Sequence, residues 1–105
     1  MKMKKVMLIC SGGMSTSLLA SKVKKLAEEK GLDLDIFAIA AQETDEELEK
    51  QKLDLILLGP QIAFMKKQIQ GKVADTGIPI DSIDRISYGM MDAKKVLEQI
   101  QGYFK

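Results

Sequence analysis

The sequence predicts an α/β fold: a single open sheet of four parallel strands, in the order 2-1-3-4, with helices on both faces. Two observations lead to this prediction. Short apolar runs, typical of strands buried on both faces, alternate with segments whose apolar residues recur at helical spacing. The connections between them are short, which favours right-handed crossovers and a parallel sheet covered by helices. With 105 residues, the chain is expected to form one domain, residues 1–105.

The first predicted strand and helix lie in residues 6–30. VMLIC at 6–10 is a continuous apolar run that ends at glycines, as a buried strand does. A helix is then predicted from Ser15 or Thr16 as far as Gly31, because four apolar residues fall on one helical face: Leu19, Val23, Leu26 and Ala27.

The same alternation continues along the chain. A second strand is predicted at 34–40, and Thr44 and Glu47 have the spacing of a capping box at the start of a short acidic helix. A third strand at 53–58 ends at Gly59-Pro60, and the apolar residues at 62, 65, 69 and 73 predict a helix that Gly71 ends or weakens. A fourth strand is predicted at 78–83 and a last helix at 92–104.

Composition excludes several classes of function. The formal net charge is +1, so no basic face dense enough for nucleic acid or an anionic membrane is expected. No apolar run approaches the roughly 20 residues that a membrane-spanning helix needs, and the start lacks a signal peptide, so we expect a cytoplasmic protein. The chain has no histidine, which rules out Ser-His and Cys-His pairs and histidine-based zinc sites. We expect neither a metal nor a cofactor.

The segment CSGGMSTS, residues 10–17, is the candidate functional site. It contains the chain's one cysteine, Cys10, at the end of the first predicted strand. In open parallel sheets ligands bind at the carboxyl ends of the strands, where the order reverses. The glycines at 12 and 13 let successive N–H groups turn inward, and the next helix adds free N–H donors and a positive dipole end. The segment is therefore predicted to cradle an anion around the sulfur.

The same donors favour a negatively charged sulfur, and a phosphoryl group carried on it would gain more, since it has more charge and three acceptor oxygens. A lone cysteine in a cytosolic protein is most often a small buried hydrophobe. Its position here favours a functional thiol instead. The spacing matches neither a Walker A motif nor GxGxxG.

The chain resembles the lactose/cellobiose (chitobiose) type of IIB component of the bacterial phosphotransferase system. The resemblance runs nearly end to end and rests chiefly on MLICSGGMSTSLLASK. It is supported by LGPQI at 58–62, by IPIDSI and by YGMMDAKKVL.

This resemblance implies a phosphoryl relay. Cys10 would accept a phosphoryl group from a phosphohistidine of a IIA protein and donate it to a sugar bound by the membrane component IIC, at the inner face of the membrane. The sugar would be a β-linked disaccharide such as cellobiose, chitobiose or lactose. We expect a monomer. The family's phosphate loop maps onto seven residues: Ser11, Gly12, Gly13, Met14, Ser15, Thr16 and Ser17.

Two other classes remain as alternatives. The fold and loop also look like those of low-molecular-weight tyrosine phosphatases, in which an arginine follows the cysteine by six positions; here that residue is Thr16. The missing arginine argues against a phosphatase, and the missing second cysteine against an arsenate reductase. A flavodoxin-like or receiver-like binding domain is the third candidate, although a receiver needs an aspartate where this chain has Leu58-Gly59.

Several residues near the predicted site have open roles. Gln61 is expected beside the loop, and Arg85, the one arginine, follows the fourth strand. Tyr88 lies in the same connection and either packs over the loop or forms a turn before the last helix. Met90 and Met91 are expected to pack in the core or at a helix start, and the acidic cluster at 43–49 to be a solvated helix.

Overall fold

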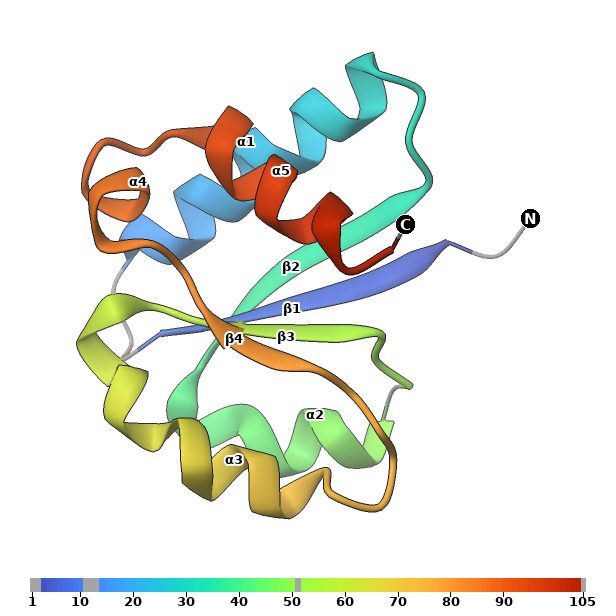
Figure 1. The fold of residues 1–105 in the computed structure, drawn as a ribbon, viewed down its shortest axis with the longest axis vertical. Helices are drawn as coiled ribbons and strands as arrows, with labels where there is room; N and C mark the ends of the chain where they lie inside the picture. The colour runs from blue at the N-terminus through green and yellow to red at the C-terminus, as the bar shows by residue number, and fades with distance from the viewer. Residues whose placement is uncertain (1–2, 11–13, 51, 105) are drawn as a thin grey trace.

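The computed structural model describes residues 3–10, 14–50 and 52–104, and within them the predicted sheet is present. Its strands are β1 (Lys4–Cys10), β2 (Leu34–Ala40), β3 (Leu55–Leu58) and β4 (Ile80–Ser82). They are parallel and lie in the order β2-β1-β3-β4, as predicted. Their carboxyl ends therefore lie at one end of the sheet, on the left of Figure 1, away from the two chain termini.

Helices cover both faces of the sheet (Figure 1). On one face lie α1 (Met14–Glu29), α4 (Arg85–Gly89) and α5 (Ala93–Gly102). On the other lie α2 (Thr44–Lys50) and α3 (Lys66–Lys72), which follow the 3-10 segments η1 (Ala41–Glu43) and η2 (Pro60–Met65). This is the three-layer arrangement that the alternating pattern predicted.

The central strand β1 divides the core into two clusters. Val6 and Leu8 pack on the side of α1 and α5, whereas Met7 and Ile9 pack on the side of α3. All four side chains are fully buried. Successive side chains of a strand point to opposite faces, so a strand covered on both faces is apolar throughout.

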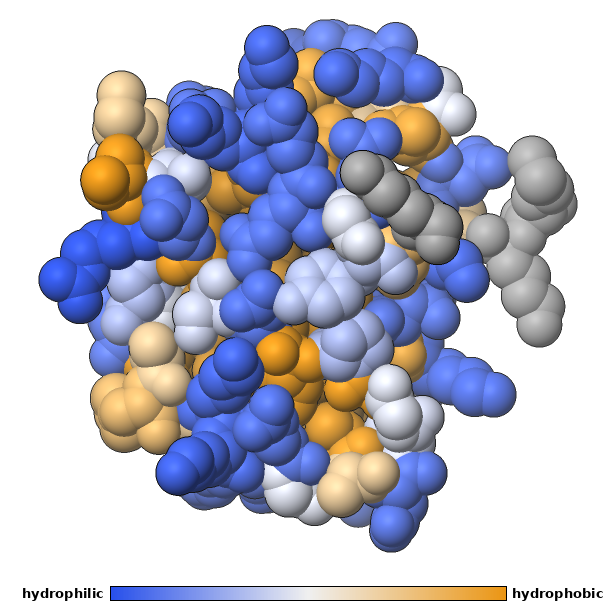
Figure 2. Space-filling model, in the orientation of Figure 1, coloured by the Kyte–Doolittle hydropathy of each residue, from blue (hydrophilic) through white to orange (hydrophobic). Residues whose placement is uncertain are grey.

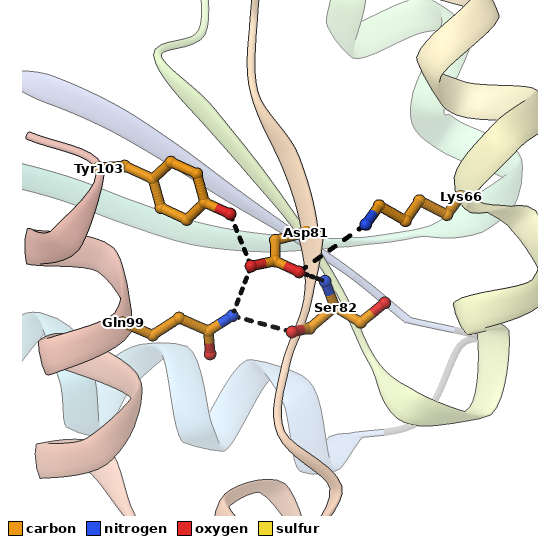
Figure 3. A network of polar contacts seen from close by, with 5 residues as sticks. All are labelled: Lys66, Asp81, Ser82, Gln99 and Tyr103. Carbon is orange, nitrogen blue, oxygen red and sulfur yellow. Dashed lines mark hydrogen bonds and ion pairs between the residues drawn. The ribbon is translucent and has the colours of Figure 1, made fainter.

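The edge strand β4 is held by a polar network around Asp81 (Figure 3). One carboxylate oxygen accepts hydrogen bonds from Tyr103 Oη at 2.6 Å and Gln99 Nε2 at 3.2 Å. The other accepts from the Ser82 N–H at 2.8 Å and lies 3.9 Å from Lys66 Nζ. Gln99 Nε2 also donates to the Ser82 carbonyl oxygen at 2.8 Å. The network joins α3, β4 and the end of α5.

This network shifts two ionisations in opposite directions. Partial burial disfavours the charged carboxylate, but the hydrogen bonds from Tyr103, Ser82 and Gln99, with the nearby Lys66 charge, hold the pKa of Asp81 below its usual range. The hydrogen bond to Asp81, aided by partial burial, raises the pKa of Tyr103 to about 12.

Several predicted boundaries differ from the structure. The third strand begins at Leu55 rather than 53, and the fourth covers only Ile80–Ser82 of the predicted 78–83, because parallel pairing with the neighbouring strand sets these limits. The single helix predicted through 62–73 is wrong: the backbone leaves helical geometry at Ile62 (φ −121°, ψ 23°). Gly71 does not end the helix, since α3 continues to Lys72.

The predicted capping box at Thr44 is also wrong. The Thr44 hydroxyl donates to the Ala41 carbonyl oxygen at 2.7 Å, and Glu43 accepts from the Ala40 N–H at 3.0 Å. The chain already turns in η1, so the capping contacts form one turn earlier. The short helix α4 was not predicted; Asp84 caps it by accepting from the Ser87 N–H at 2.9 Å.

Candidate functional site

Cys10 is the last residue of β1, at the carboxyl end of the sheet. It is paired with Ala40 at the end of β2, and Ile9 before it is paired with Leu58 at the end of β3. The thiol residue is 5% exposed, and its Sγ donates a hydrogen bond to the Ile39 carbonyl oxygen at 3.5 Å. In the sheet, β2 lies on one side of β1 and β3 lies on its other side, so the strand order reverses at β1. Cys10 therefore lies at this switch point, where open α/β sheets bind ligands.

The segment after Cys10 is only partly described. Ser11, Gly12 and Gly13 lie outside the described residues. Met14 and Ser15 form the start of α1, so this helix begins one residue before the predicted Ser15. The N-terminus of a 16-residue helix thus follows Cys10 within four residues, which is the order of elements that the anion-cradle prediction requires.

Thr16 and Ser17 are placed very differently within that first turn. Ser17 is exposed to solvent, whereas Thr16 is fully buried. The Thr16 hydroxyl lies 2.7 Å from the hydroxyl of Tyr88, and either can donate. In this chain, the position six residues after the cysteine therefore holds a buried hydroxyl that is paired with a second hydroxyl.

Tyr88 is the site residue that sequence reasoning left out. It lies in α4, 72 residues along the chain from Thr16, and its side chain reaches the start of α1. We expected it either over the loop or in a turn, and both are partly right: it belongs to a short helix and contacts the first turn after the loop. No spacing rule links residues so far apart, so only the sheet order could have suggested the contact.

Gly59 and Gln61, which follow β3, also lie in the region around Cys10 and Tyr88. Gly59 is buried, and its N–H donates to the Ile9 carbonyl oxygen at 2.9 Å, next to Cys10. A Cβ on Gly59 would lie 3.0 Å from Gln61 Oε1 and 3.7 Å from the Tyr88 ring. Gln61 therefore lies beside the end of β3, as expected, and the absence of a side chain at Gly59 leaves room for the Gln61 amide.

Exposed apolar side chains also occur at this end of the molecule. Figure 2 shows apolar surface on the left in separate places, over α4 and over the η2 segment, with hydrophilic side chains between them. The exposed large apolar side chains in or directly after α1, η2 and α4 are Leu18, Phe64, Ile86 and Met90, which we call the apolar rim. Met90 was expected in the core or at a helix start but is 73% exposed, whereas Met91 packs against the core. Arg85 is exposed at the start of α4.

Residues 3–10, 14–50 and 52–104 contain no group of three or more cysteine, aspartate or glutamate side chains arranged to hold a metal ion. Among the helices of these residues, none is both long and apolar enough to cross a bilayer.

The fold and the position of Cys10 define a class: a flavodoxin-like α/β protein with a thiol at the carboxyl end of the first strand, four residues before a helix N-terminus. Comparison with known families identifies the family within this class. Residues 5–99 match the family described as the PTS system, Lactose/Cellobiose specific IIB subunit. The chain belongs to this family, so it is a IIB component of a sugar phosphotransferase system.

Curated relatives agree with this assignment over nearly their whole length. The chain is 41% identical to the oligo-β-mannoside-specific EIIB component of Bacillus subtilis, covering 92% of each chain. It is 46% identical to the galactose-specific EIIB component and 45% identical to the cellobiose-specific EIIB component, both of Lactococcus lactis, covering 90% of each chain.

Solved structures show the same fold. The cellobiose-specific IIB component of Borrelia burgdorferi superposes with a TM-score of 0.74 at 37% identity, covering 96% of this chain and 91% of that one. The lactose-specific IIB domain of Streptococcus pneumoniae gives a TM-score of 0.87 at 20% identity, covering 99% and 100% of the two chains. The second likeness concerns the fold alone.

Proposed function

We propose that Cys10 is the phosphoryl carrier of this IIB component, receiving the group from a phosphohistidine of a IIA protein and passing it to a sugar on the membrane component IIC. The observation that carries the proposal is the position of the thiol: it ends β1 at the switch point of the sheet, four residues before the N-terminus of α1. The protein contains no histidine and no second cysteine, so Cys10 is its most suitable nucleophile for such a relay.

The first transfer moves the phosphoryl group without loss. The Cys10 thiolate attacks phosphorus, an S–P bond forms as the N–P bond of the donor imidazole breaks, and the imidazole nitrogen keeps the electron pair. Residues 11–17 would surround the group with N–H and hydroxyl donors, and the dipole of α1 would favour its negative charge.

In the second transfer the sulfur is the leaving group instead of the nucleophile. A sugar hydroxyl oxygen forms the new O–P bond, the S–P bond breaks, and its electron pair returns to sulfur, while the hydroxyl proton leaves to a base or to water. Thr16 stands where a phosphatase has its arginine, and its hydroxyl cannot grip two transferring oxygens as a guanidinium does. Hydrolysis should then be slow, which suits a carrier that must wait for its sugar.

The apolar rim supports docking of protein partners around Cys10. Phe64 is 81% exposed, Ile86 70% and Met90 73%; Phe64 lies in η2, Ile86 in α4, and Met90 directly follows α4. Aromatic and methionine side chains are enriched in protein–protein interfaces. Because IIA and IIC must both reach the same sulfur, we infer that both use this rim, one after the other. The sugar is proposed to be a β-linked disaccharide such as cellobiose, chitobiose or lactose.

The test is the intact mass of the purified protein after incubation with phosphoenolpyruvate, the general phosphotransferase proteins and a lactose/cellobiose-type IIA. The wild type should gain the mass of one phosphoryl group. Cys10→Ser should fold normally and gain none, because a serine hydroxyl is a far weaker nucleophile than a thiolate at neutral pH. Full phosphorylation of Cys10→Ser would disprove the nucleophile. Absence of transfer to the wild type, with the IIA itself phosphorylated, would disprove the relay with that donor.

A further inference from the structure

The buried pair Thr16–Tyr88 is the feature that the proposed function leaves unused. Its two hydroxyl oxygens are 2.7 Å apart, Thr16 is fully buried and Tyr88 is 9% exposed. A tyrosine hydroxyl normally finds a partner when buried, but here the partner is a side chain in the first turn of α1, six residues after Cys10. The pair therefore links α4 to the segment that would hold a phosphoryl group.

Tyr88 is itself held firmly. Its N–H donates to the Asp84 carbonyl oxygen at 2.9 Å, and its carbonyl oxygen accepts from the Met91 N–H at 3.1 Å. Asp84 further fixes α4 by accepting from the Ser87 N–H and hydroxyl, at 2.9 and 3.0 Å. The position of the phenol is thus set by the connection after β4.

The ring of Tyr88 also lies against the end of β3. A Cβ placed on Gly59 would come within 3.7 Å of the ring, and the Gly59 N–H is bonded to the Ile9 carbonyl oxygen. From its own position after β4, Tyr88 therefore contacts the start of α1 and lies near Gly59 at the end of β3. Its hydroxyl is the one polar atom of this side chain beyond the backbone, and it is aimed at Thr16.

Counting hydrogens gives the pair a chemical role. Two hydroxyls have two hydrogens between them, and the bond that joins them uses one. When Tyr88 donates to Thr16, the Thr16 hydrogen is left for a further acceptor; when Thr16 donates, it has none to offer. A phosphoryl group on Cys10 would bring three acceptor oxygens to the start of α1.

We propose that Tyr88 is a positioning residue for phosphoryl transfer: it donates its hydrogen bond to Thr16 Oγ1 and so directs the Thr16 hydroxyl hydrogen toward the phosphoryl group on Cys10. This inference rests on the proposed function. No hydrogen leaves either oxygen during the transfer, so the pair orients a donor and does not act as an acid or base.

The experiment measures single-turnover phosphorylation of the full-length protein at several concentrations of phosphorylated IIA, which separates the maximal rate from the half-saturating concentration. Tyr88→Phe should lower the maximal rate by about tenfold, the effect of losing one well-placed hydrogen bond. The half-saturating concentration should stay unchanged, because the pair is buried beneath the docking surface.

Three further variants keep the test specific. Thr16→Val should slow transfer as much as Tyr88→Phe does, and the double variant should be no slower than either, because both changes remove the same donor. Thr16→Ser retains the hydroxyl and should keep a rate near that of the wild type. Tyr103→Phe is the matched control: it removes the hydroxyl of the other tyrosine, which is bonded to Asp81 at the edge strand, and should leave the rate unchanged.

Each outcome decides the inference. A folded Tyr88→Phe protein with a rate within about twofold of wild type would overturn it, as would a double variant slowed by the product of the two single effects. An increase in the half-saturating concentration alone would assign Tyr88 to docking instead and would also overturn it. If Tyr88→Phe does not fold, equal rates for Thr16→Val and Thr16→Ser overturn the role of the pair. Failure of the proposed function is distinct, because the wild type itself would then accept no phosphoryl group.

Discussion

The two tyrosines of this protein make opposite kinds of polar contact. Tyr88 lies 9% exposed at the carboxyl end of the sheet, and its hydroxyl meets the neutral hydroxyl of a fully buried threonine. Tyr103 is 40% exposed after α5, and its hydroxyl donates to the charged carboxylate of Asp81 at 2.6 Å. The first contact joins two connections beside Cys10, whereas the second fastens the edge strand β4 to the last helix.

The difference shows where each contact derives its stability. A buried hydroxyl that loses its partner has no water to replace it, so the buried pair depends on both members being present. A partly exposed carboxylate can regain water, but its charge makes the contact depend on pH and salt. The site is therefore held by an uncharged pair, and the charged network is kept at the edge of the sheet.

The largest expected effect on stability comes from the buried pair. Thr16→Val or Tyr88→Phe should each lower the free energy of unfolding by about 1–3 kcal/mol, because one hydroxyl stays buried without a partner. The double variant should cost clearly less than the sum of the two single changes, since no orphaned hydroxyl remains. Urea denaturation measures all three. Additive costs would mean that the two hydroxyls contribute independently.

A smaller effect is expected from Asp81→Asn, about 1 kcal/mol at neutral pH, because a third of the Asp81 side chain is exposed and solvent screens the loss. The folded pKa of Asp81 is lowered, so its charge stabilises the protein above the unfolded pKa, near 3.9, and this stability is lost as the pH falls through the folded value. The advantage of wild type over the variant should therefore shrink below about pH 4. Denaturation at pH 7, 5 and 3 tests this, and a constant difference would contradict it.

The smallest effect is expected from Lys66→Met in the same network. Lys66 Nζ lies 3.9 Å from Asp81, and the two side chains are 40% and 34% exposed. Such pairs are screened by solvent, so the loss should be about 0.5 kcal/mol or less and should vanish at high ionic strength. Denaturation at low and high salt measures it. A larger, salt-independent loss would mean that the lysine acts by packing its alkyl chain rather than by its charge.

Much of the fold could be predicted from local patterns. The apolar run of β1 and the helical spacing of α1 and α5 predicted the α/β class, because elements buried on one or two faces leave distinct periods in the sequence. The predicted strand order 2-1-3-4 was also confirmed. The failures lie in short segments. The break at Ile62 and the helix α4 span too few residues to leave a period, and their geometry depends on what packs against them.

Part of the candidate site could also be predicted from local patterns, and part could not. Cys10 and the start of α1 could be placed from the chain itself, since a strand, two glycines and a helix follow one another directly. The partner of Thr16 could not, because Tyr88 is 72 residues away and only the pairing of β3 with β4 brings α4 to this end of the sheet. The apolar rim was missed for a related reason: its members are scattered over three elements, and no stretch of sequence contains them all.

By itself, then, the amino-acid sequence determined the layered architecture and the location of the thiol, which depend on periodicity and on residues adjacent in the chain. Only the tertiary structure decided which hydroxyl meets Thr16, which carboxylate holds Tyr103 and which apolar side chains are exposed near the carboxyl end of the sheet. Contacts of this kind are made between distant segments, and their geometry depends on how the helices pack across the sheet, which no local pattern records.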